Sequence, residues 1–327
     1  MTDHFIEDKS TKVAANVEGH EGKVDFNDLK TGGFIKQRQK DLFTVRLRCP
    51  GGRLSTDKLV EISKLAHKYS KKSVVHFSFR QSLEILYVDY KDFHELVAEL
   101  KKIGQEVASC GPRVRVPTAC GGCEYNPNGL TDTQKMAAMV DQKFFGTRTP
   151  HKFKTCFSGC PIDCARTKEM DYGFQGVVEP VWDETSCTGC TICSEACKDD
   201  AIESHPDSGK PIFDPLKCIY CGDCIRACPT EAWKAKRYGH TVRIGGKHGR
   251  HPMEAVTVCN FLPDEKVPDA IHKTVEWYNA NGKRGERIGN ALKRVGIKNY
   301  LEFMEPVFKS GSTAEWVVGE QGVKKDK

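Results

Sequence analysis

Sixteen cysteines in 327 residues are the side chains of this sequence best suited to chemistry. Two of them, Cys160 and Cys164, are four residues apart, and Pro161 follows the first. Proline fits the first position of a helix, where its missing N–H would be unpaired anyway. We therefore expect a helix to begin near Cys160, with Cys164 one turn further along on the same face. Two thiolates at that spacing can hold two corners of an iron–sulfur cluster.

A second cysteine group, Cys120-Gly-Gly-Cys123, lies upstream of the first. The stretch from Asn128 to Thr133 follows it, with the sequence Asn-Gly-Leu-Thr-Asp-Thr. Taken together, the two groups resemble the cluster-binding core of the siroheme sulfite and nitrite reductases. That family usually separates the two upstream cysteines by five residues, whereas here Asn126 stands at the expected second place. A zinc site of four thiolates, or a set of buried structural thiols, is the competing interpretation.

The resemblance implies a [4Fe-4S] cluster held by Cys120, Cys160 and Cys164, with Cys164 as the thiolate shared with the iron of siroheme. The fourth ligand stays open between two residues of the sequence. Cys123 is preferred because it belongs to the same loop as Cys120, and Cys156 is the rival because it lies four residues before Cys160. Three further cysteines are expected to be ordinary buried thiols, namely Cys49, Cys110 and Cys259.

A repeated cysteine pattern follows the first groups. Each copy has the spacing C-x-x-C-x-x-C-x-x-x-C, and Pro229 ends the second. This is the pattern of two-cluster bacterial ferredoxins, in which the fourth cysteine of each run ligates the other cluster. The spacing predicts one cluster on Cys187, Cys190, Cys193 and Cys228, and a second on Cys218, Cys221, Cys224 and Cys197. With the first cluster, the sequence thus predicts three [4Fe-4S] clusters.

Composition limits the class of protein. Met1 to Ser10 is polar and shows no secretory leader, and no apolar run approaches the length of a membrane span. Cysteines grouped in this way in such a chain favour metal centres over disulfides, and they predict a reducing cytoplasm. The net charge of +6 is spread along the chain, so a nucleic-acid partner is not expected.

The elements that must position these cysteines begin with an α+β unit. Leu42 to Cys49 alternates like a strand, Ser55-Thr56-Asp57 is typical of a helix start, and residues 74–79 and 83–88 read as strands before a helix over 92–103. The stretch from Val45 to Gly52, together with Phe79-Arg80-Gln81, resembles the ferredoxin-like half-domain of the sulfite and nitrite reductase repeat.

The rest of the chain reads as a host domain interrupted by the cysteine repeats. We expect a basic strand over 112–117, a helix over 131–144, strands over 152–156, 172–181, 241–244 and 255–259, a glycine-rich basic loop over 245–252, and helices over 267–279, 284–295 and 300–308. The expected domains are a loose arm over 1–30 that could wrap a partner, the half-domain over 31–108, the siroheme domain over 109–180 and 238–310, the inserted two-cluster ferredoxin over 181–237, and a tail over 311–327.

Basic side chains that recur beside these motifs are the candidates for anion binding, because the planar fork of arginine suits carboxylates and sulfur oxyanions alike. Siroheme carries many carboxylates, and the resemblance implies basic residues that clamp them. The candidates for the substrate are Arg46, Arg80, Lys247 and Arg250, and those for siroheme are Arg48, Arg113, Arg115 and His248.

These features predict an oxidoreductase that reduces sulfite to sulfide with six electrons delivered through the ferredoxin insert. Reduction of nitrite to ammonia on the same cofactors is the alternative, and a non-catalytic electron carrier with an empty siroheme pocket is a third interpretation. The resemblance is closest to single-repeat members of the family, which are the siroheme subunits of anaerobic sulfite reductases and small dissimilatory-type proteins. A second copy or another subunit is then expected to complete the site, and a reductase subunit or ferredoxin to supply electrons.

Overall fold

The computed structural model describes residues 14–17 and 21–312, so most of the predicted tail and part of the predicted arm lie outside the described residues. Within these ranges the chain forms two compact units. The first contains residues 14–17, 21–118 and 138–154, and the second contains residues 119–137 and 155–312. No helix in the described ranges is long and apolar enough to cross a bilayer.

The first unit is built on a four-stranded antiparallel sheet with the order β3-β4-β6-β5. Its strands are β3 (Phe34–Lys36), β4 (Leu42–Arg46), β5 (Val75–Phe77) and β6 (Leu83–Asp89). Two helices accompany the sheet, α2 (Thr56–Tyr69) and α3 (Phe93–Lys102). The predicted strand–helix–strand–strand–helix order is therefore present, with ends that differ by a few residues.

The core of this unit follows from the spacing of apolar residues. The hydroxyl oxygen of Ser55 accepts the N–H of Lys58 at 3.3 Å and caps α2. Ile62 and Leu65 then recur on one helix face and pack with Val45 and Ile85 of the sheet. These buried contacts hold β4 and β6 in place. Basic and acidic side chains project from the ends of these two strands.

The arm predicted over residues 1–30 contains regular structure where it is described. A short hairpin joins β1 (Ala14–Asn16) to β2 (Lys23–Asp25), and helix α1 (Phe26–Thr31) follows. The carboxylate of Asp25 accepts the N–H of Asn27 at 2.7 Å and starts that helix. The helix is too short for a periodic pattern to show in the sequence, which is why it was not predicted.

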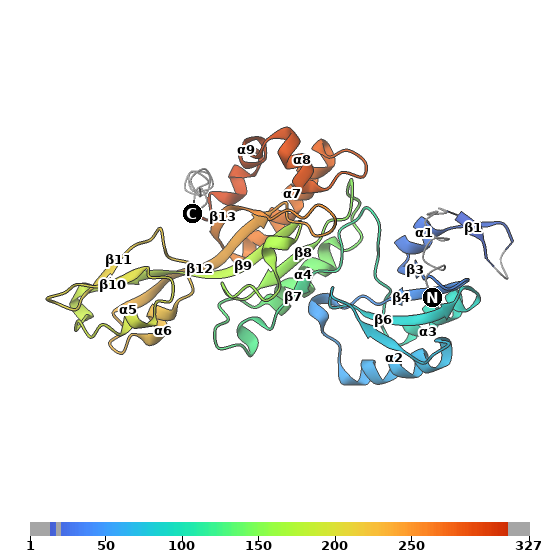
Figure 1. Cartoon of the computed structure of the whole chain (residues 1–327), viewed down its shortest axis with the longest axis horizontal. Helices are drawn as coiled ribbons and strands as arrows, with labels where there is room; N and C mark the ends of the chain where they lie inside the picture. The colour runs from blue at the N-terminus through green and yellow to red at the C-terminus, as the bar shows by residue number, and fades with distance from the viewer. Residues whose placement is uncertain (1–13, 18–20, 313–327) are drawn as a thin grey trace. The chain divides into compact units, whose positions relative to one another are not determined.

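The second unit is built on a five-stranded sheet with the order β13-β12-β9-β8-β7. Strand β8 runs parallel to β9, and β12 is antiparallel to both of its neighbours. The strands are β7 (Thr118–Ala119), β8 (Thr155–Ser158), β9 (Tyr172–Trp182), β12 (Trp233–Ile244) and β13 (Val256–Leu262). The helices are α4 (Thr133–Phe144), which continues into the first unit, and α7 (Val267–Asn281), α8 (Ile288–Val295) and α9 (Ile297–Phe308), which pack together beside β13 (Figure 1).

The cysteine repeats interrupt this sheet at one place. Strands β9 and β12 pair until Trp182 faces Trp233, and residues 183–232 lie between these two points. They form two short α-helices and one hairpin, with the elements α5 (Ile192–Ala196), β10 (Ile202–Ser204), β11 (Pro211–Phe213) and α6 (Asp223–Ala227). The segment is drawn in yellow and orange in Figure 1. A chain that leaves along one strand and returns along its neighbour can carry such a segment without breaking the sheet.

The basic strand predicted over residues 112–117 is absent. The segment makes isolated bridges instead, between Arg113 and Arg148 and between Val114 and Phe153. Pro112 and Pro117 have no N–H to donate, so a continuous ladder cannot form there. These bridges place residues 109–118 and 138–154 with the first unit, whereas the sequence grouped them with the siroheme domain.

Candidate functional site

A pocket of about 350 Å³ in the first unit gathers six basic side chains. No Asp or Glu lines it among the described residues. Three of the basic residues were predicted from the sequence and three were not. The predicted ones are Arg46, Arg80 and Arg115, and the others are Lys30, Lys152 and Lys154. Six positive charges in one concavity create a field that concentrates small anions.

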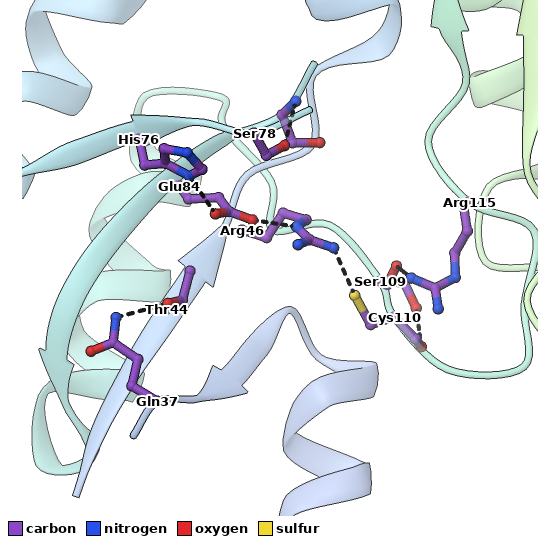
Figure 2. Close-up of polar contacts among 10 residues, drawn as sticks. Gln37, Thr44, Arg46, His76, Ser78, Glu84, Ser109, Cys110 and Arg115 are labelled. Carbon is purple, nitrogen blue, oxygen red and sulfur yellow. Dashed lines mark hydrogen bonds and ion pairs between the residues drawn. The ribbon is translucent and has the colours of Figure 1, made fainter. Parts of the chain in front are cut away.

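Backbone carbonyl groups hold the arginines of this pocket in place. An Nη of Arg80 donates to the carbonyl oxygen of Val116 at 2.8 Å. Arg115 donates to the carbonyl oxygens of Ser109 at 3.2 Å and Gly111 at 3.0 Å, and Figure 2 shows the first of these contacts. A neutral acceptor fixes the direction of a guanidinium without cancelling its charge, so the positive field of the pocket persists.

Lys152 and Lys154 enter the pocket because of their register. They flank Phe153, which is fully buried. The N–H of Phe153 donates to the carbonyl of Arg113 at 3.0 Å, and its carbonyl accepts the N–H of Arg115 at 2.8 Å. Alternation in this extended segment points both lysines away from the core. Their Lys-x-Lys spacing just before Cys156 was a usable signal, but Lys30 carries none.

Two other predicted arginines lie outside this pocket. Arg48 lines a different cavity, where its Nε donates to a carboxylate oxygen of Asp141 at 2.7 Å and another guanidinium nitrogen pairs with Glu106. These two carboxylates neutralise it. Arg113 is joined to Arg148 through its backbone and does not line the pocket. A siroheme role for either residue stays a prediction.

The predicted helix start at Cys160 is wrong, because the chain makes two successive turns there. The N–H of Asp163 donates to the carbonyl of Cys160 at 3.1 Å, and the N–H of Arg166 donates to that of Asp163 at 2.8 Å. Asp163 and Arg166 both have left-handed backbones, with φ of 57° and 61°, and cannot continue a right-handed helix. The Asp163 carboxylate secures the turns by accepting from Ser158 and Thr167 at 2.7 to 2.9 Å.

The structure brings Cys120 close to Cys160 and Cys164 in the second unit. The N–H of Gly159 donates to the sulfur of Cys120 at 3.1 Å. Burial raises the pKa of the Cys160 thiol, the nearby Cys120 and Cys164 add to the rise, and a backbone hydrogen bond from Ile162 opposes it. Sulfurs that converge and accept backbone N–H groups are suited to hold an iron–sulfur cluster. The residues present therefore fit such a group.

Cys123 and Cys156 differ in their surroundings. Cys123 is exposed, and it follows Gly122, which packs so closely on Gly159 that a Cβ on Gly159 would stand 2.7 Å from the Gly122 Cα. Cys156 is fully buried in β8, and the charge of Arg243 lies close enough to interact with it. Cys123 thus lies exposed in the loop that contains Cys120 and packs against Gly159, whereas Cys156 lies inside the sheet.

Residues 183–232 sort the repeated cysteines into two groups. Cys187, Cys190, Cys193 and Cys228 line one cavity together with Trp233. In the other group, burial raises the pKa of Cys224 to about 12, and Cys218, Cys221 and Cys197 lie close enough to add to the rise. Among the described residues, no three His, Cys, Asp or Glu side chains stand close enough to hold a single metal ion.

The glycine-rich basic loop belongs to the second unit. Lys247 pairs with Met253 through backbone hydrogen bonds at 2.8 and 2.9 Å, and its Nζ donates to Asn290 at 2.9 Å. The Nε2 of His248 is hydrogen-bonded to the carboxylate of Glu169, and Arg250 is exposed. These three residues therefore lie in a different unit from Arg46 and Arg80, and their roles remain predictions.

Comparison with known proteins matches most of the chain. The profile of the nitrite and sulphite reductase 4Fe-4S domain covers residues 110–310, and that of the nitrite/sulfite reductase ferredoxin-like half domain covers residues 35–103. The chain belongs to the nitrite and sulphite reductase family. The family inferred from the cysteine motifs is confirmed, as is a mixed α/β fold that begins with a ferredoxin-like half-domain.

Several similar proteins are named as sulfite reductases. The coenzyme F420-dependent sulfite reductase of Methanocaldococcus jannaschii is 34% identical over 85% of this chain, which spans only 44% of that protein. One subunit of the anaerobic sulfite reductase of Salmonella typhimurium is 28% identical over 81% of this chain and 83% of its own length. The crystal structure of dissimilatory sulfite reductase I superposes on 81% of this chain and 69% of its own, with a TM-score of 0.67 and 21% identity, which shows a shared fold.

Proposed function

We propose that this chain is the siroheme-bearing unit of a sulfite reductase that converts sulfite to sulfide with six electrons. The observation that carries the proposal is the pocket of six basic side chains, in a chain of this family whose other unit brings Cys120, Cys160 and Cys164 together. Relatives of the chain are named as sulfite reductases, and sulfite is a small divalent oxyanion. A cationic pocket without carboxylates suits it.

The basic residues divide by their chemistry. The arginines Arg46, Arg80 and Arg115 stay protonated in proteins and present a planar fork, so they bind and orient oxygen atoms. Lys152 and Lys154 carry ammonium groups that can release a proton. Reduction of sulfite breaks three S–O bonds and needs protons as well as electrons. We assign orientation to the arginines and proton donation to the lysines.

Siroheme and a [4Fe-4S] cluster, when bound, supply an iron centre and single electrons for the reduction. We assign the cluster to Cys120, Cys123, Cys160 and Cys164, with Cys164 as the sulfur shared with siroheme. The loop position of Cys123 and the burial of Cys156 inside β8 support this choice of fourth ligand. Arg115, which lines the pocket, remains the candidate there for a siroheme carboxylate.

Residues 183–232 are proposed to be a two-cluster ferredoxin that carries electrons into the domain. The cavity lined by Cys187, Cys190, Cys193 and Cys228 supports the first cluster, and the closeness of Cys197 to Cys218 supports the second. In this proposal the fourth cysteine of each group would come from the other repeat, which is the arrangement typical of two-cluster ferredoxins. Electrons would come from a partner reductase subunit or a ferredoxin.

Anaerobic purification followed by one spectrum, an iron analysis and two turnover assays tests the function. We expect absorption bands in the Soret region and in the red, about thirteen iron atoms per chain, and sulfite turnover with reduced viologen. The family profile also covers nitrite reductases, so turnover of nitrite faster than that of sulfite would identify nitrite as the substrate. About eight iron atoms without red absorption would contradict the enzyme and leave an electron carrier.

A further inference from the structure

Three side chains stand abreast across the sheet of the first unit, behind the basic pocket. The register pairs Arg46 of β4 with Glu84 of β6, and Glu84 with His76 of β5. All three project from the same face because they are direct cross-strand partners. Figure 2 shows the Glu84 carboxylate between the imidazole of His76 and the guanidinium of Arg46.

Each oxygen of the Glu84 carboxylate has its own partner. The Nε of Arg46 donates to Oε1 at 2.7 Å, and the Nδ1 of His76 lies 3.0 Å from Oε2. On its far side, the Nη1 of Arg46 donates to the sulfur of Cys110 at 3.3 Å (Figure 2). The guanidinium is therefore held from two sides, and its plane is set by the sheet rather than by the pocket.

Burial makes this arrangement stiff. The Glu84 side chain is 8% exposed, whereas that of Arg46 is 25% exposed and that of His76 is 55% exposed. A carboxylate this deeply buried would be strongly destabilised if its charged partner moved away. Arg46 is thus restrained at Nε, and because it also lines the pocket, its remaining N–H groups are left for an anion there.

The row cannot be a route for protons into the pocket. A proton could pass from solvent to His76 and Glu84, but Arg46 stands next, and an arginine keeps its proton in proteins. The row must therefore act through position and charge. Glu84 brings a negative charge to a pocket whose lining has six positive ones, so it weakens the attraction for anions while it fixes one of the forks.

We propose that Glu84 is a positioning residue for the reaction, which orients Arg46 for a two-point contact with a sulfur oxyanion, and that His76 steadies it through the second carboxylate oxygen. The identity of the anion rests on the proposed function. Placement of a reactant to within about 1 Å can change a rate by about 100-fold, so a small rotation of Arg46 would be felt in turnover.

The test is Glu84→Gln in the full-length holoprotein, with Glu99→Gln as the matched control. Glu99 forms a surface ion pair with Lys68 in the same unit and does not line the pocket. Glutamine keeps the shape and loses the charge. We expect sulfate, measured by calorimetry, to bind about three- to tenfold more tightly, and kcat for sulfite to fall about tenfold or more, with the control unchanged.

Opposite changes in affinity and turnover are not expected of a residue that only supports the fold. Two milder variants, which should leave the fold intact, give a further test of the positioning role. Glu84→Asp should restore wild-type sulfate affinity with a lower kcat, and His76→Gln should lower kcat about two- to threefold. Weaker sulfate binding by Glu84→Gln, or an unchanged kcat, would overturn the inference. If Glu84→Gln binds sulfate more tightly than the wild type, but the wild-type protein itself does not reduce sulfite, the proposed function alone is overturned.

Discussion

In the second unit, the cysteines come from short repeated stretches of the chain, whereas the basic pocket of the first unit draws on residues as distant as Lys30 and Lys154. The cysteine groups are held by local turns, as between Cys160 and Asp163. The basic pocket is held by strand register and by carbonyl groups from remote segments, as between Arg80 and Val116. The cysteine groups can therefore be recognised from the spacing of residues in the sequence, whereas the basic pocket exists only once the sheet has formed.

Neighbouring basic residues of the sequence also differ in the charges that surround them in the fold. Two arginines two residues apart in the sequence, Arg46 and Arg48, have opposite environments. Arg46 lines a pocket without carboxylates and has one carboxylate behind it, whereas Arg48 is neutralised by two. A repeated basic pattern in a strand therefore does not identify anion-binding residues, because the partners across the fold decide which charges remain available.

The largest loss of iron and of activity is expected from a substitution in the cysteine region. Cys160→Ser should remove the cluster that Cys120, Cys160 and Cys164 would hold, because a hydroxyl is a poor ligand for iron. We expect a loss of about four iron atoms per chain and of all sulfite turnover, measured by iron analysis and a viologen assay. Cys259→Ala removes a fully buried thiol of the same unit and is the control. An unchanged iron content in Cys160→Ser would break the assignment of this region.

The fourth ligand sharpens the same comparison. Cys123→Ala should lose the cluster signal in electron paramagnetic resonance, whereas Cys156→Ala should keep it and lose only stability. The buried Cys156 side chain lies inside β8, so its removal leaves a small void that costs about 1 kcal/mol in thermal unfolding. The reverse pattern, with the signal lost in Cys156→Ala alone, would assign the ligand to the strand instead of the loop.

The basic pocket should respond in turnover and leave the iron content intact. Arg80→Ala removes one fixed donor, and loss of such a donor typically lowers kcat about 100- to 1000-fold. Arg80→Lys should recover only part of the rate, because an ammonium cannot make the two-point contact. Lys64→Ala, in an exposed ion pair with Glu61, is the matched control. If Lys64→Ala lowers kcat as strongly as Arg80→Ala does, the loss of turnover is not specific to the pocket, and the pocket is not the substrate site.

Arg48→Ala should affect stability and leave sulfate binding unchanged. Burial raises the pKa of Asp141, and Arg48 opposes that rise. Without Arg48 the carboxylate stays buried and unpaired, so we expect about 3 kcal/mol lower unfolding free energy at neutral pH. A carboxyl group with a raised pKa in the folded state loses its penalty when protonated, so the deficit should shrink as the pH falls through that pKa. A constant deficit from neutral to acid pH in urea unfolding would contradict this account.

Much of the fold could be predicted because its elements are locally encoded. The Ser55 cap and the spacing of Ile62 and Leu65 predict α2 without reference to the rest of the chain. The turn at Cys160 could not be predicted in the same way, since Pro161 favours a helix. There the Asp163 carboxylate, bonded to Ser158 and Thr167, stabilises a left-handed residue that no local pattern indicates.

The cysteine motifs carried the resemblance to the family and predicted metal clusters, because most sulfurs of each proposed ligand set lie a few positions apart in the sequence. Tertiary structure alone brought Lys30, Lys152 and Lys154 to Arg46, Arg80 and Arg115, and it alone gave Arg48 two carboxylates. The physical reason is range: a turn is fixed by neighbouring backbone groups, whereas a pocket of like charges must be held by strand pairing and carbonyl dipoles from distant parts of the chain.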